Sequence, residues 1–92
     1  MTTIFKYPII VGNEPTITIA MPVGAQVLSF ADQCSRPTIW ALVDPDAATE
    51  NRRFLFAPTG GPIAEPPDRL KFIGTALFHS GSLVFHLFEV TP

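Results

Sequence analysis

The chain has 92 residues, of which 47% are hydrophobic and 15% are charged, and its formal net charge is -2 at pH 7. This length allows a single domain, residues 1–92, and so small a domain buries only about 60 to 65% of the surface that its unfolded chain exposes. The slightly acidic balance argues against a protein that binds long nucleic acids, because such proteins need an excess of Lys and Arg to displace counterions from phosphates.

The high apolar content favours self-association, because a small monomer has little interior in which to hide apolar side chains. We expect a homodimer or a higher homo-oligomer, and the alternative is a monomer with a Phe-rich core. The single cysteine, Cys34, excludes an internal disulfide and a cysteine-based structural metal site. We expect no signal peptide, because the first residues lack a charged region followed by a long apolar stretch, and no apolar run reaches the roughly 20 residues of a membrane helix. We therefore expect a soluble protein that works in a reducing cytoplasm and binds no membrane.

The first half of the chain has the patterns of strands separated by turns. Residues 3–11 are rich in β-branched and aromatic side chains, but Pro8 removes a backbone donor, which predicts an edge strand or a bulge. Residues 16–21 alternate polar and apolar, as does a strand with one face on the core and one in water. Residues 25–33 could form a helix by composition, but the turn signals on both sides favour a strand.

The next stretch begins with residues 38–43, which are apolar on both faces and predict a central strand. Residues 52–57 predict another strand. Residues 59–68 hold two adjacent glycines and three prolines. This longest irregular stretch is the loop best suited to a function. A turn at residues 66–70 is the only helical candidate.

Residues 72–90 predict a hairpin around which the rest of the chain is organised, because Gly81 at its turn can adopt a positive φ. Counting outward from the turn pairs Thr75 with His86 and Ile73 with Phe88. Both faces of the hairpin are apolar, so it must be covered twice, by a second sheet plus another layer or by a second copy of the chain.

These elements together predict an all-β fold. We expect a small single-domain sandwich or barrel of about seven short antiparallel strands, with the C-terminal hairpin at its centre.

Few side chains in this sequence could carry chemistry. His79 and His86 are the only histidines and no third ligand accompanies them, so we expect no metal site and no cofactor. We interpret His86 as a core or interface residue with Thr75 as its hydrogen-bond partner. No base is placed beside a serine or cysteine, so we expect no catalytic residue and no enzyme. Asp44 and Asp46 are explained by turn formation.

The remaining candidates are cationic, aromatic or donor groups that would suit a nucleotide. Guanidinium groups bind phosphates bidentately and stack on bases, and Trp offers a second stacking surface. Amides and hydroxyls of the glycine-rich loop would add donors, and the Thr75 and His86 pair is the only polar feature of the hairpin faces. The alternative is that the cations form a solvated rim. The candidate ligand-binding residues are Arg36, Trp40, Arg52, Arg53, Thr59, Gly60, Gly61, Arg69, Thr75 and His86.

Several segments together resemble a widespread family of small proteins of tailed phages and prophages that carry a domain of unknown function. The segments are MTTIFKY, MPVGAQVLSF, IWALVDPD, RRFLF with TGGPI, and FIGTALFHSGSLVFHLFE. They span nearly the whole chain. The resemblance implies a phage origin and a place in the cytoplasm of the infected bacterial host.

Small oligomeric phage proteins without catalytic residues also resemble, in general character, the viral proteins called sponges. These proteins sequester the cyclic nucleotide signals of antiphage immunity, as in those that counter the CBASS defence. The leading hypothesis is therefore a non-enzymatic protein that sequesters a cyclic di- or oligonucleotide immune signal at a subunit interface and so blocks antiphage defence. The alternative is a phage protein-protein interaction module, which inhibits a host protein or assists virion assembly.

Overall fold

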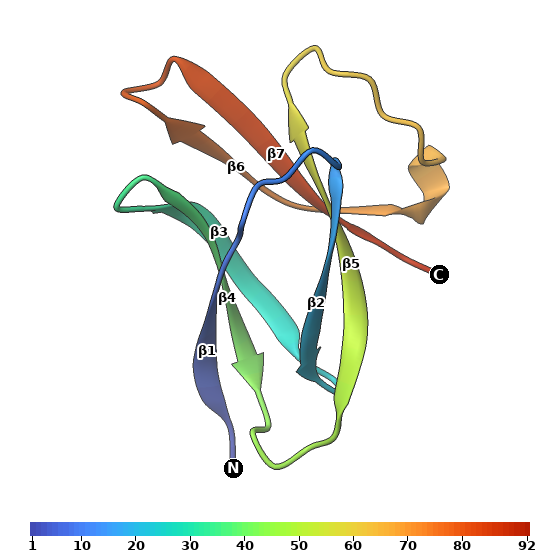
Figure 1. The fold of residues 1–92 in the computed structure, drawn as a ribbon. Helices are drawn as coiled ribbons and strands as arrows, with labels where there is room; N and C mark the ends of the chain where they lie inside the picture. The colour runs from blue at the N-terminus through green and yellow to red at the C-terminus, as the bar shows by residue number, and fades with distance from the viewer.

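The computed structural model describes residues 1–92 as two antiparallel sheets that pack face to face and do not close into a barrel (Figure 1). The strands are β1 (Thr3–Pro8), β2 (Thr16–Pro22), β3 (Gln26–Gln33), β4 (Arg36–Val43), β5 (Thr49–Pro58), β6 (Leu70–Phe78) and β7 (Leu83–Val90). The all-β prediction is confirmed, and every predicted strand is present. The one helical element is a 3-10 turn, Pro67–Arg69, and no helix could span a membrane.

The smaller sheet has the order β1-β4-β3. Strand β4 lies in its centre, as the doubly apolar residues predicted, and β1 with Pro8 lies at an edge. Strands β3 and β4 form a hairpin whose two turn residues, Cys34 and Ser35, have positive φ angles of 51° and 68°. Such a turn matches the twist of the strands but strains residues with a Cβ, which is why Asn-Gly is the usual choice there.

The larger sheet has the order β2-β5-β7-β6, so the predicted hairpin supplies the internal strand β7 and the edge strand β6. Both β5 and β6 are antiparallel to β7 and are therefore parallel to each other. Parallel strands need a crossover connection, and residues 59–69 provide it. Because the smaller sheet occupies the inner face of β7, this crossover passes over the outer face.

The predicted hairpin register is confirmed from the turn as far as the pair of Gly74 with Leu87, and it includes Thr75 opposite His86. The predicted pair of Ile73 with Phe88 is wrong, since a bulge between Phe72 and Gly74 shifts the register by one residue. Ile73 turns inward and packs against the core. A Cβ on Gly74 would lie 3.8 Å from the Cβ of Phe30, so the bulge brings β6 close to β3.

The main core lies between the sheets and contains a group of interlocking aromatic rings. Their centroids are 4.3 to 6.4 Å apart in the pairs that touch. The rings belong to Phe30, Phe56, Phe78 and Phe85. Edge-to-face and stacked contacts of this kind stabilise a core beyond its area burial.

A second, smaller apolar cluster lies on the outer face of the larger sheet. Leu55, Ala57 and Val90 are buried there, and Leu70 and Phe88 pack against them. The expected second cover of the hairpin is thus supplied in part by the chain itself, through the crossover of residues 59–69. That cover is incomplete, and it leaves part of β6 open to solvent.

Candidate functional site

A row of three polar side chains crosses the outer face of the larger sheet. The Nδ1 atom of His86 lies 2.9 Å from the Oγ1 atom of Thr75, and its Nε2 atom lies 2.6 Å from the Oγ1 atom of Thr59. Thr75 is the cross-strand neighbour of His86 on β6. Thr59 follows the end of β5, where its backbone N–H donates to the carbonyl of Val84 and extends the ladder.

The chemistry of the row follows from the two nitrogens of the imidazole. A neutral ring has one donor and one acceptor nitrogen, so one threonine hydroxyl donates to His86 and the other accepts from it. The accepting hydroxyl keeps its own hydrogen for a ligand. A hydroxyl hydrogen-bonded to an imidazole is also the arrangement of a nucleophile and its general base in many enzymes. Here the row is exposed on the surface of the sheet and lines none of the pockets of the structure.

Two exposed apolar side chains flank this row on the same face of β6. Phe72 is 58% exposed and Leu77 is 59% exposed. The ring of Phe72 meets that of Phe88 edge to face at a centroid distance of 5.5 Å, which fixes its position. We call Thr59, Phe72, Thr75, Leu77 and His86 the outer patch.

The structure therefore gathers half of the predicted ligand-binding residues at one place, because Gly60 and Gly61 follow Thr59 directly. Gly60 has a positive φ of 84°. The N–H of Gly61 donates to the carbonyl of Pro58. Sequence reasoning found the pair of Thr75 with His86 but missed the contact of Thr59 with His86. That contact depends on β5 lying beside β7, which no local pattern indicates.

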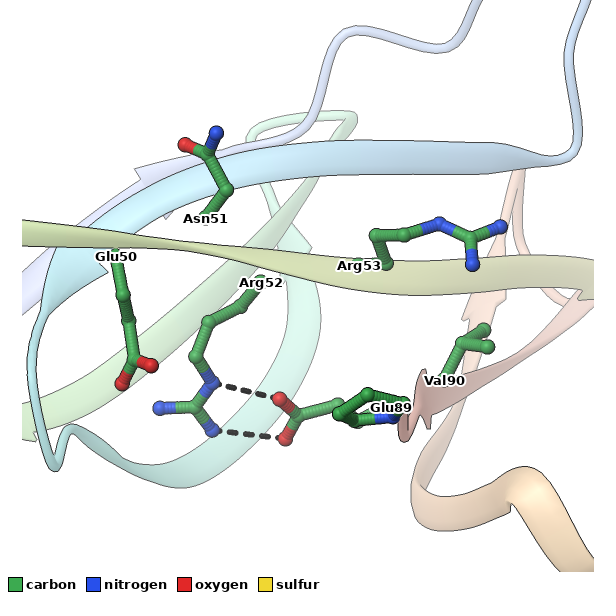
Figure 2. A pocket seen from close by; sticks show the side chains of 7 residues that line it. Glu50, Asn51, Arg52, Arg53, Glu89 and Val90 are labelled. Carbon is green, nitrogen blue, oxygen red and sulfur yellow. Dashed lines mark hydrogen bonds and ion pairs between the residues drawn. The ribbon is translucent and has the colours of Figure 1, made fainter.

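Arg52 lies on the inner face, away from the outer patch, and its charge is matched within the chain (Figure 2). Its Nε and Nη2 atoms donate to the two carboxylate oxygens of Glu89 at 2.6 and 2.8 Å. Its Nη1 atom donates to the backbone carbonyl of Ala25 at 2.6 Å. The hydrogen bond to Glu89 raises the pKa of Arg52 against the opposing effect of burial. Arg52 therefore braces β5 to β7 and to the start of β3, which leaves it little capacity for a phosphate.

Two pockets of about 290 Å³ each flank this ion pair. Figure 2 shows the first, in which Glu50 and Arg52 leave β5 on one side while Asn51 and Arg53 leave it on the other. The second lies between Gln26–Leu28 of β3 and the bulge of β6. Since Arg52 and Glu89 line both pockets, an ionic ligand in either would compete with their mutual hydrogen bonds.

The other predicted cations are not brought together. Arg36 begins β4 and, like Trp40, belongs to the smaller sheet. Arg53 faces the outer side, where its guanidinium lies 4.0 Å from Glu65 of the crossover. Arg69 ends the 3-10 turn, and its carbonyl accepts hydrogen bonds from Thr91. One chain alone thus assembles the predicted hydroxyl and amide donors but not the predicted phosphate-binding group.

A family model described as a domain of unknown function (DUF7352) matches residues 1–92. The chain belongs to the DUF7352 family. No curated protein and no solved structure matches the chain. Membership in DUF7352 confirms the expected domain of unknown function and assigns it no ligand, so the function has to be argued from the geometry.

Replacement of Arg52 by alanine is expected to lower the free energy of unfolding by about 2 to 4 kcal/mol, because it leaves the half-buried carboxylate of Glu89 without a partner. The double variant Arg52→Met with Glu89→Leu should cost clearly less than the two single changes together. Urea unfolding measures these values. Arg36→Ala, an exposed cation without an ion pair, is the control. A cost for Arg52→Ala as small as that of the control would contradict the bracing role.

We expect the free energy of unfolding to fall at alkaline pH because of Tyr7. Burial raises its pKa above 10.0, and the nearby positive charge of Arg52 lowers it only in part. As the pH rises above about 10, the phenol of the unfolded chain ionises first, so the free energy of unfolding falls until the folded phenol ionises as well. Tyr7→Phe should remove this component.

Urea unfolding at several pH values between about 9 and 11 tests the effect in both proteins. The chain has one tyrosine, so the absorbance of phenolate reports this group alone. Equal pH dependence in the two proteins would contradict the expectation.

Proposed function

We propose that this DUF7352 protein is a non-enzymatic binding module that docks a protein partner through the outer patch. The observation that carries the proposal is the pair of exposed side chains, Phe72 and Leu77, on either side of an ordered polar row. Protein interfaces combine aromatic and apolar anchors with a few hydrogen bonds in this way. A small ligand would instead need a concave pocket that buries most of its surface.

The chemistry of the outer patch specifies the kind of partner. None of its five side chains carries a permanent charge, so the matching surface is apolar, uncharged and able to hydrogen-bond. Phe72 is the natural anchor, because aromatic residues dominate binding energy at interfaces. His86 holds both threonines in place, so the donors and acceptors are oriented before the partner arrives.

The resemblance to proteins of tailed phages suggests which partner the module would bind and where it would act. The partner would then be a host protein that the module inhibits or a virion component whose assembly it assists. The place of action would be the cytoplasm of the infected bacterial host.

The double variant Phe72→Ser with Leu77→Ser tests the proposal. The partner is a protein that the wild type retains from infected-cell extract and that also binds after purification. We expect the double variant to bind this partner with at least about tenfold lower affinity than the wild type does. Both side chains are exposed, so the fold should change in stability by about 0.5 kcal/mol or less per site. Isothermal calorimetry with the purified partner gives the affinity.

The matched control is Val23→Ser with Leu28→Ser, because these two apolar residues are about equally exposed but lie outside the outer patch. A partner that binds the outer-patch variant as well as the wild type, or that loses affinity equally in the control, would refute docking at this surface.

A second candidate function is sequestration of a cyclic di- or oligonucleotide immune signal. The convergence of Thr59, Gly60, Gly61, Thr75 and His86 favours it, because hydroxyls and amides recognise base edges and sugars. Phe72 beside them offers a face on which a base could stack. The cations for the phosphates would have to come from a second subunit, which fits a pocket formed at a subunit interface.

Thermal shift against a panel of cyclic di- and trinucleotides tests this second function. A sponge that outcompetes an immune receptor needs a Kd near nanomolar, about 12 kcal/mol, so the melting temperature should rise clearly. Thr75→Val with His86→Phe should abolish the shift, whereas Val23→Ser with Leu28→Ser, outside the outer patch, should keep most of it. No shift with any member of the panel at high micromolar concentration would remove this function.

A further inference from the structure

Strand β2 is the one edge strand in this protein without a charge, an internal proline or a bulge that would prevent pairing with another strand. Natural proteins blunt exposed edges with charges, prolines and bulges. Strand β1 carries Lys6 and Pro8. Strands β3 and β6 each contain a bulge. Strand β2 has an unbroken register with β5, no charged residue, and its only proline at its last position.

The direction of the backbone groups of β2 follows from its hydrogen bonds. The carbonyl of Pro15 accepts from the N–H of Phe56 at 2.9 Å, and the N–H of Val23 donates to the carbonyl of Ala48 at 2.7 Å. Both bonds continue the register of β2 with β5. The backbone N–H and C=O groups of the odd-numbered residues between them therefore point toward β5. The residues whose N–H and C=O groups point outward, away from β5, are Thr16, Thr18 and Ala20.

We propose that β2 pairs antiparallel with β2 of a second copy of this chain, which joins the two four-stranded sheets into one. The register that uses every outward-pointing group places Thr18 opposite Thr18 on the two-fold axis and Thr16 opposite Ala20 on either side of it. Each of these pairs exchanges two backbone hydrogen bonds. The interface is isologous, as most homodimer interfaces are.

The side chains of β2 are complementary to themselves in this register. On the outer face, threonine meets threonine or alanine, a favourable set of cross-strand pairs. On the inner face, Ile17 meets Ile19 of the second copy. Just before the strand, Glu14 falls opposite Pro22, so no like charges face each other.

A groove beside this edge receives the isoleucines of the second copy. It has a volume of about 320 Å³ and is lined by residues of the β1 end and of β2, which are Pro8, Ile9, Ile10, Ile17, Thr18 and Ile19. Ile10 is 80% exposed in the single chain. Pairing would cover it with Ile17 and Ile19 of the second copy, which gives the dimer apolar burial in addition to backbone hydrogen bonds.

The second copy is favoured over an unrelated peptide because the edge and the groove are present in both chains, so the contact satisfies both at once. Strand β2 lies at the opposite edge of the larger sheet from β6. The outer patch, which is centred on β6 and β7, therefore stays accessible in the dimer, and the inference does not rest on the proposed function.

Light scattering and a pair of charge variants test the proposal. The wild type at up to about 100 µM is expected at twice the 10.0 kDa mass of the chain. Thr18→Lys and Thr18→Glu should each raise the dimer Kd by about tenfold or more, because each places like charges opposite each other on the axis. A mixture of the two variants should form a heterodimer. Gln26→Lys, which adds the same charge to the edge of β3, is the control and should leave the dimer intact.

Hydrogen exchange of the wild type gives an independent measurement should a variant fold poorly. The amides of Thr16, Thr18 and Ala20 have no partner within one chain and should be protected only at concentrations where the dimer forms. A wild type that stays at 10.0 kDa, charge variants that dimerise as well as the wild type, a mixture that forms no heterodimer, or free exchange of these amides in a dimer would each overturn the proposal.

Discussion

Strand β7 carries large apolar side chains on both faces, and the need to cover it twice determines the rest of the architecture. The smaller sheet covers its inner face through the aromatic core. Its outer face is covered by the chain that links β5 to β6, two parallel strands that flank β7. This crossover reaches the side of β5, where Glu65 lies 4.0 Å from Arg53, but it leaves Phe72 and Leu77 of β6 exposed. The outer patch is the part of the second face that this cover leaves open.

The positions of the charged side chains follow from the same arrangement of sheets. The inner face has to be apolar wherever the sheets meet, so Arg52 and Glu89 can lie on it only as a bidentate pair at the margin of the core. Their pairing closes the gap between β5, β7 and the start of β3. Cations elsewhere remain at separate rims of the sandwich. The outer patch of a single chain consequently consists of hydroxyl, imidazole and apolar groups.

Local patterns were enough to predict the strands and part of the site. The alternation of residues 16–21, Pro8 at an edge and the pair of Thr75 with His86 all depend on residues close in sequence, and all are confirmed. The contacts that were missed join distant segments: Arg52 lies 37 residues from Glu89. The bulge between Phe72 and Gly74 was also missed, since counting outward from the turn assumes a regular register.

The position of β7 between β5 and β6 also constrains the order of folding. Strand β6 has no hydrogen-bonded neighbour in its sheet other than β7, which is the last strand of the domain to be synthesised. The larger sheet therefore cannot be completed before residue 90 has left the ribosome. Until then the apolar strand β6 has to remain unpaired. Completion of the larger sheet should thus be limited by the long-range pairing of β5 with β7, as is typical of proteins with high contact order.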